Sequence, residues 1–214
     1  MNLSFSREDR ENVEENYRRI KDAVGFSGNF ALTRQEHTDI VYECEAADGF
    51  YIYDTVVDGL VTDKSGICLT VFIADCVPVL IADPKTRCIA AVHSGWRGTA
   101  KKITANAVKL MAEKYGADPK DMVAAVGPCI GKCCYEVGED VLKGFGNPAF
   151  FTAKKNGKYM LDLNLANYSV LEGAGLSREN IHVSGECTFC KSDLYYSHRA
   201  TNGKRGNLAA MIEI

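Results

Sequence analysis

The chain has 214 residues and a formal net charge of −3, with 46% hydrophobic and 25% charged residues. This length predicts one compact domain over residues 1–214, with residues 1–25 forming an N-terminal helix packed on it. The composition is typical of a soluble globular protein, and the lack of a basic excess argues against a nucleic-acid partner. The charged N-terminal segment and the short apolar runs argue against a secretory signal and a membrane partner, so we expect a cytoplasmic protein.

Cysteine and histidine contents limit the kind of functional site. The sequence holds nine cysteines and four histidines. In a reducing compartment, an odd number of cysteines indicates free thiols, metal ligands or a reactive thiolate rather than a disulfide framework. So few histidines exclude any centre that needs many imidazole ligands.

The first predicted element is an amphipathic helix over residues 6–23. Ser6 begins a capping pattern, Val13 and Tyr17 recur at helical spacing, and Gly25 ends the helix. The short apolar runs that follow are typical of strands. These strands are predicted over residues 29–33, 40–43, 51–53 and 59–62.

The middle of the chain predicts a buried sheet followed by a helix. Three apolar runs, at 67–74, 77–82 and 89–93, are typical of strands covered on both faces. Thr99 is expected to cap a helix that Gly116 ends. This order favours a mixed α/β or α+β layered sandwich. Further strands are predicted over 122–126, 181–184, 195–197 and 209–213, and further helices over 136–145 and 163–173.

Three side chains form a candidate metal and catalytic site. Cys76 lies in the segment IADCVP, where Pro78 cannot donate a ladder hydrogen bond and so indicates a strand end. His93 closes the next predicted strand, and His37 follows the first one. Two imidazoles and a thiolate suit zinc with an open fourth position, which is typical of a catalytic centre. The alternative is a buried core thiol with two hydrogen-bonded loop histidines.

The segment SGWRGT at 94–99 has two interpretations. Its glycines and the free amides at a helix start suit an anion, and Arg97 is able to pair with phosphate or carboxylate. Alternatively, the glycines serve only the turn geometry and Trp96 packs in the core. Arg199, in a basic cluster near the C-terminus, faces either an anionic substrate or solvent. Arg97 and Arg199 are therefore the candidate substrate-binding residues.

The remaining cysteines outside the strands also allow two interpretations. Cys187 and Cys190 form a CxxC, and Cys129, Cys133 and Cys134 lie in the segment GPCIGKCC. A second, four-thiolate zinc site is one interpretation. Because no second CxxC is present and the spacing is irregular, unpaired structural thiols are favoured.

Three motifs closely resemble those of the YfiH/laccase-domain family, also called the multicopper polyphenol oxidase family. They are QEH at 35–37, IADCVPV at 73–79 and AVHSGWRG at 91–98, and shorter matches continue to the C-terminal end of the sequence. The resemblance implies a layered α-β-β-α sandwich, shared with cysteine hydrolases. It also implies that zinc is bound by His37, Cys76 and His93.

The resemblance implies phosphorolysis of adenosine, inosine and methylthioadenosine, together with deamination of adenosine. The partners would then be a purine nucleoside and phosphate. A copper polyphenol oxidase is an alternative, but only His182 and His198 remain to build a multinuclear copper centre. Two further alternatives are a thiol hydrolase, in which His93 activates Cys76 to attack a peptidoglycan-precursor amide, and a binding protein without turnover. The oligomeric state stays open.

Overall fold

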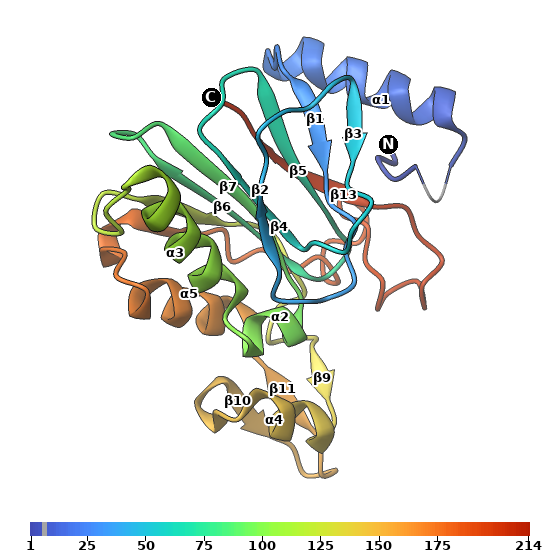
Figure 1. Ribbon diagram of the computed structural model, residues 1–214. Helices are drawn as coiled ribbons and strands as arrows, with labels where there is room; N and C mark the ends of the chain where they lie inside the picture. Colours follow the sequence, from blue (N-terminus) through green and yellow to red (C-terminus); the bar gives the residue numbers. More distant parts are fainter. Residues whose placement is uncertain (6–7) are drawn as a thin grey trace.

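The computed structural model describes residues 1–5 and 8–214. None of the helices in these ranges has the length and apolar character needed to cross a membrane. In chain order (Figure 1) the elements are α1 Arg10–Val24, β1 Asn29–Leu32, β2 Val41–Glu43, β3 Phe50–Ile52, β4 Gly59–Thr62, β5 Ile67–Ile73, β6 Val77–Asp83, β7 Cys88–Ser94, α2 Trp96–Ala100, α3 Ile103–Tyr115, β8 Val123–Val126, β9 Glu136–Val137, α4 Glu139–Phe145, η1 Pro148–Phe150, β10 Phe151–Ala153, β11 Tyr159–Leu161, α5 Leu163–Gly173, η2 Arg178–Asn180, β12 Ile181–Val183 and β13 Leu208–Ile212.

Two sheets lie face to face between helices. One has the strand order β13-β5-β1-β3, and the other has the order β12-β8-β6-β7-β4-β2. Helix α1 covers the outer face of the first sheet, while α3 and α5 cover the outer face of the second (Figure 1). This arrangement confirms the predicted mixed α/β sandwich with α-β-β-α layers.

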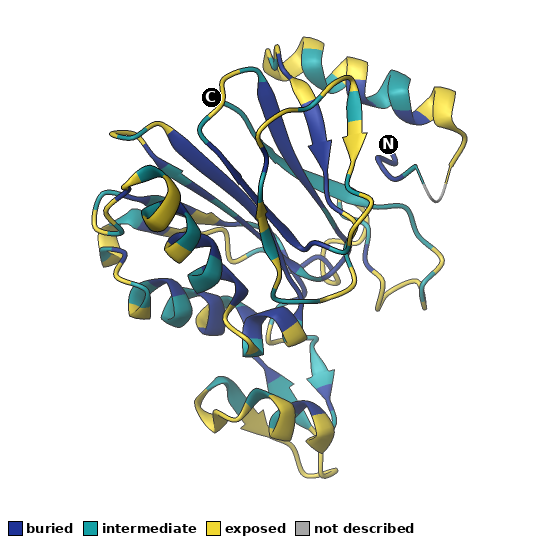
Figure 2. Cartoon of the chain, viewed as in Figure 1, coloured by how far each residue is buried: buried dark blue, intermediate teal, exposed yellow. Residues whose placement is uncertain are grey.

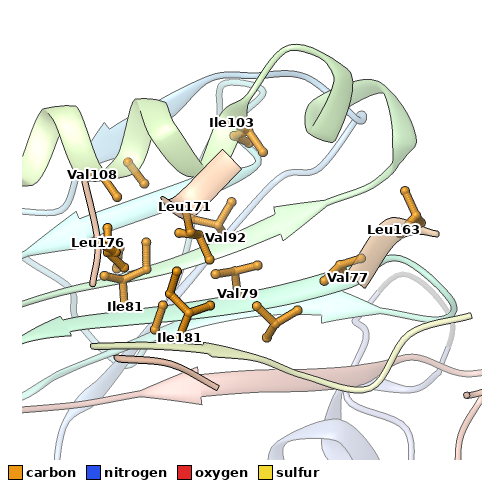
Figure 3. Packing of buried hydrophobic residues seen from close by; sticks show 14 of the residues in the cluster. Val77, Val79, Ile81, Val92, Ile103, Val108, Leu163, Leu171, Leu176 and Ile181 are labelled. Atoms are coloured by element: carbon orange, nitrogen blue, oxygen red, sulfur yellow. The ribbon is translucent and has the colours of Figure 1, made fainter. Parts of the chain in front are cut away.

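Each interface between layers has its own hydrophobic core. Val13 and Tyr17 of α1 pack against the first sheet, and a second cluster fills the space between the sheets. The third cluster joins the second sheet to α3 and α5, and Figure 3 shows Ile103 and Val108 of α3 facing the strands. Figure 2 shows the central strands buried and the outward helix surfaces exposed.

Strand β7 shows why the apolar runs are continuous. Ile89 and Ala91 point into the space between the sheets, whereas Ala90 and Val92 point toward α3 and α5. Because successive side chains of a strand alternate between faces, a strand with layers on both sides must be apolar at every position. The prediction of doubly covered strands is confirmed.

The helix predictions were partly right. Helix α1 ends at Gly25, whose φ is +86°, as expected, while the proposed cap at Ser6 lies outside the described residues. The helix expected from Thr99 is instead two helices, α2 and α3. They are separated at Lys102, which has a left-handed φ of +61° and cannot continue an α-helix.

A small third sheet, in the order β10-β11-β9, lies with α4 beside the sandwich (Figure 1). The helix predicted over 136–145 is wrong at its start, because Glu136 and Val137 pair with β11 and the extended Gly138 precedes α4. The hairpin of β10 and β11 was not predicted. The strand predicted over 195–197 is also wrong, because this segment is an irregular part of a loop between turns.

Candidate metal centre

Two crossings between the sheets bring the predicted ligands to one end of the sandwich. Strands β1 and β5 are parallel neighbours in the first sheet, and each is followed by a strand of the second sheet. His37 lies in the β1–β2 connection and Cys76 in the β5–β6 connection. Strand β7 runs antiparallel to β6, with His93 opposite Pro78. The C-terminal ends of β1, β5 and β7 therefore meet where β6 begins.

The structure brings all three predicted ligands together. One donor atom from each of His37, Cys76 and His93 lies within 4.8 Å of the others. The Cys76 Sγ is 3.5 Å from His37 Nε2, and the two imidazole rings are nearly perpendicular, with centroids 4.8 Å apart. His93 is buried, Cys76 is half-buried and His37 is exposed. The group therefore opens to solvent on the His37 side.

Asp58 holds two of the ligands in place. Its side chain is fully buried, and its Oδ1 accepts a hydrogen bond from His93 Nδ1 at 2.7 Å. The backbone N–H groups of Glu36, His37 and Thr38 also donate to this carboxylate, at 3.2, 3.0 and 2.8 Å. These bonds fix a turn in which His37 has a φ of +62°. A carboxylate behind a histidine ligand is the usual outer partner of a metal centre.

Asp58 is not among the residues that the sequence patterns predict for this site. An Asp-Gly pair before a predicted strand is typical of a surface turn, so nothing local marks this side chain as buried. The sequence offers only an indirect reason to look for such a residue. A metal-ligating histidine donates its other ring N–H to an acceptor, so His93 as a ligand calls for a nearby carboxylate or carbonyl.

Charges at the centre favour a thiolate beside an imidazolium when no metal is bound. Burial raises the pKa of Cys76, but the positive charge on His93 and the hydrogen bond with His37 outweigh it and lower that pKa to about 6. Burial lowers the pKa of His93, whereas the Cys76 thiolate and Asp58 raise it to about 9. Metal binding would displace the proton from His93.

The donor set fits zinc. Because His93 Nδ1 is bonded to Asp58, Nε2 is the nitrogen left to a metal, and His37 presents its own Nε2 toward the sulfur. Two imidazole nitrogens and one thiolate form a three-ligand set with an open position, which suits zinc or a single copper ion. A multinuclear copper centre does not fit, because His182 lies in β12 away from the cleft lining and leaves His198 as the one further histidine among the described lining residues.

The glycines of the 94–99 turn are explained by packing. A Cβ on Gly95 would lie 2.5 Å from His37 Cδ2 and 3.2 Å from Cys76 Sγ, and one on Gly98 would lie 2.8 Å from Thr38 O. Only glycine lets the backbone approach the ligands this closely. This favours the geometric interpretation of the two glycines. Trp96 is half-buried and packs against the hydrophobic core cluster of the second sheet, as that interpretation expects.

A cleft of about 660 Å³ surrounds the three ligands. The candidate substrate-binding residues Arg97 and Arg199 both line it. The Arg97 guanidinium lies 4.4 Å from the centre of the Trp96 ring, and that of Arg199 lies 5.3 Å from the centre of the Tyr135 ring. Both cations are thus placed on aromatic faces within reach of the cleft.

The charge of the described lining is mostly positive. Arg34 and Arg205 join Arg97 and Arg199, and the one acidic lining residue is Asp75. Asp75 is already engaged, because its carboxylate accepts hydrogen bonds from the Thr188 hydroxyl at 2.6 Å and the Arg199 backbone N–H at 2.7 Å. Such a cleft suits an anionic ligand.

Comparison with known proteins places these features in a family. A family described as "Multi-copper polyphenol oxidoreductase laccase" matches residues 1–214. The chain is 34% identical over 218 residues to the protein named purine nucleoside phosphorylase YlmD of Geobacillus stearothermophilus, which covers 96% of this chain and 80% of that relative. It is 37% identical over 149 residues to adenosine deaminase RL5 of an unknown prokaryotic organism, covering 67% of this chain and 56% of that protein.

A solved structure, that of the hypothetical protein YfiH of Bacillus licheniformis, superposes with a TM-score of 0.91 at 31% identity. The match covers 100% of this chain and 85% of that one. The fold agrees with the sequence profile and with the motifs that carry the three ligands. The chain therefore belongs to the multi-copper polyphenol oxidoreductase laccase family, the YfiH family that its motifs predict.

Proposed function

We propose that this protein is a zinc-dependent purine nucleoside phosphorylase, acting on adenosine, inosine and methylthioadenosine, with adenosine deamination as a side activity. The observation that carries the proposal is one cleft that holds both a His₂Cys ligand set and several arginines. The relatives named purine nucleoside phosphorylase and adenosine deaminase support the same reactions. All nine cysteines are free thiols, which is consistent with a cytoplasmic location.

We infer that His37, Cys76 and His93 hold the metal and form the catalytic centre. Zinc bound there would act as a Lewis acid with one position open to substrate or water. Asp58 would keep His93 in the tautomer that presents Nε2. The exposed side of His37 gives the substrate its approach to the centre.

The cleft also offers groups for both substrates. Its volume of about 660 Å³ is within the range of small-molecule sites, and Phe72, Trp96 and Tyr135 supply aromatic surface for a purine and its sugar. Arg97 and Arg199 would bind phosphate through charge-assisted hydrogen bonds. In phosphorolysis, a phosphate oxygen bonds to the sugar carbon as the carbon–nitrogen bond to the purine breaks. The two arginines would hold that oxygen in position.

A thiol hydrolase acting on a peptidoglycan-precursor amide is the second candidate, because the centre also has the pattern of a nucleophilic triad. The Cys76 thiol has a lowered pKa beside His93, and His93 is oriented by Asp58. This reaction needs Cys76, His93 and Asp58, whereas a metal centre also needs His37. The two functions therefore differ in their requirement for His37.

The test compares His37→Ala with the unchanged protein. We expect inosine cleavage that depends on added phosphate, ammonia release from adenosine, and bound zinc measured by mass spectrometry. The His37→Ala substitution should remove about one zinc per chain and lower phosphorolysis by about a hundredfold or more, since a three-ligand site loses an essential donor.

His182→Ala is the matched control, because this exposed histidine is in β12 and is not among the described lining residues. It should keep both zinc and activity. If His37→Ala had the same zinc content and the same phosphorolysis as the unchanged protein, the metal-dependent proposal would be wrong. Amide hydrolysis that survived in His37→Ala and disappeared in Cys76→Ala would favour the thiol hydrolase instead.

A further inference from the structure

A group of four cysteines lies outside the His37–Cys76–His93 centre. The sulfur atoms of these four cysteines all lie within 4.8 Å of one another. The Sγ of Cys190 is 3.7 Å from that of Cys133 and 3.4 Å from that of Cys134. All nine cysteines are free thiols, so no disulfide accounts for this closeness. The four members are Cys133, Cys134, Cys187 and Cys190.

Backbone contacts hold the two contributing loops side by side. Cys129 and Cys187 form an isolated parallel bridge, in which Thr188 N–H donates to Cys129 O at 2.9 Å. Gly131 N–H donates to the Cys187 sulfur at 3.2 Å, a bond that suits a thiolate. A Cβ on Gly131 would lie 3.1 Å from Cys187 Cβ and 3.2 Å from Cys133 Sγ, so glycine permits the approach.

The spacing of the sulfurs matches a tetrahedral metal. Four sulfurs at about 2.3 Å from a zinc ion lie about 3.8 Å from one another. The two measured pairs, at 3.4 and 3.7 Å, are close to this value. Four thiolates leave no open position and select a soft or borderline ion, which is the pattern of a structural zinc site. We propose a second, structural zinc site whose ligands are Cys133, Cys134, Cys187 and Cys190.

The position of this thiolate site indicates its role. Tyr135 follows its first loop and lines the cleft, and Thr188 in its second loop donates to Asp75, which is adjacent to Cys76. Arg199 also bonds to Asp75 through its backbone N–H. A metal at the four thiolates would therefore fasten together a loop that lines the cleft through Tyr135 and a loop that supports the lining residue Asp75 through Thr188. The sequence allowed a four-thiolate site but its irregular spacing favoured unpaired structural thiols, because the fold rather than a second CxxC brings the two pairs of cysteines together.

The test isolates the thiolate site in a Cys76→Ala background, which removes a ligand of the first centre. Zinc content is measured by mass spectrometry after dialysis. We expect about one zinc per chain in Cys76→Ala and almost none after adding Cys190→Ser or Cys133→Ser. Both added substitutions are at exposed cysteines, so the fold should survive, and circular dichroism verifies it. Cobalt in place of zinc should show thiolate-to-metal absorbance that the same substitutions abolish.

Adding Cys88→Ala to the Cys76→Ala background is the control, because Cys88 is a buried thiol in β7 and not a member of the cluster. It should keep the zinc. Equal zinc content with and without Cys190→Ser would overturn the proposal, as would a Cys134–Cys190 disulfide in protein that binds no zinc. Because Cys76 is absent from every sample, failure here leaves the proposed function intact, and failure of the first centre leaves this site intact.

Discussion

Asp58 connects His93 to the turn that carries His37, two of the three proposed metal ligands. It bonds to His93 and to three backbone N–H groups of the turn that presents His37. Replacing Asp58 by Asn keeps the shape but removes the charge and places an amide donor opposite other donors. We expect zinc affinity at this centre to fall by about 10-fold to 100-fold. Titration of activity against free zinc measures the change.

Asp83→Asn is the matched control for Asp58→Asn. Asp83 is also a buried carboxylate, and it accepts from Lys85 N at 2.9 Å and from the Thr86 hydroxyl. Both substitutions should destabilise the fold by about 1–3 kcal/mol through unsatisfied buried groups. Only Asp58→Asn should weaken zinc binding. Equal zinc affinities in the two variants would show that Asp58 serves stability alone.

Residue chemistry explains why the grouping of the three candidate ligands could be predicted and the residue that supports them could not. His37, Cys76 and His93 are of the residue types that bind zinc, and Pro78 marked the strand end beside Cys76. The role of Asp58 depends on a contact between residues far apart in the sequence, with His93 35 positions away. The cluster of four cysteines has the same difficulty, since its two pairs meet only in the folded chain.

At the scale of elements, long apolar patterns were predicted well and short ones poorly. Strands β5, β6 and β7 are each apolar on both faces, so their burial could be predicted from the sequence alone. Strands β9, β10 and β11 have two or three residues each, and pairing with one another rather than periodicity defines them. The break between α2 and α3 depends on one left-handed residue, Lys102, which no local pattern marks.

The C-terminal strand is tied to the loop between α1 and β1 by Glu213. Its Oε1 accepts hydrogen bonds from Ser27 N, Ser27 Oγ and Gly28 N, at 3.1, 2.7 and 2.9 Å. Burial raises the pKa of Glu213, but these bonds outweigh burial and lower that pKa below its usual range. We expect Glu213→Gln to lose about 1 kcal/mol of unfolding free energy at neutral pH.

The direction of the pKa shift of Glu213 determines how the stability difference between the two proteins changes with pH. A carboxylate with a lowered pKa in the folded state contributes stability above its unfolded pKa and loses it as pH falls through the folded pKa. The difference between the parent and Glu213→Gln should therefore shrink as the solution becomes acidic. Urea unfolding at a series of pH values measures it, with the exposed Glu179→Gln as control. A difference independent of pH would contradict this account of Glu213.

At the scale of the whole molecule, charge is distributed unevenly. The net charge is −3, yet the described part of the cleft wall carries four arginines and one carboxylate that is already hydrogen-bonded. Both sheets end at the same edge of the sandwich. The connections between the sheets that carry His37 and Cys76 also lie at this edge. One architecture thus concentrates the proposed metal ligands and positive charge in a protein that is acidic overall.

This charge distribution predicts how phosphate binds. Arg97→Gln removes a cation from the cleft, so the KM for phosphate should rise about tenfold or more, the usual effect of losing a charge-assisted hydrogen bond. Added salt should raise the parent's KM for phosphate, and Arg97→Gln should show a weaker salt dependence. Arg178→Gln is the control, because this arginine pairs with Glu172 and is not among the described lining residues. An unchanged KM in Arg97→Gln would assign phosphate binding to other arginines of the cleft.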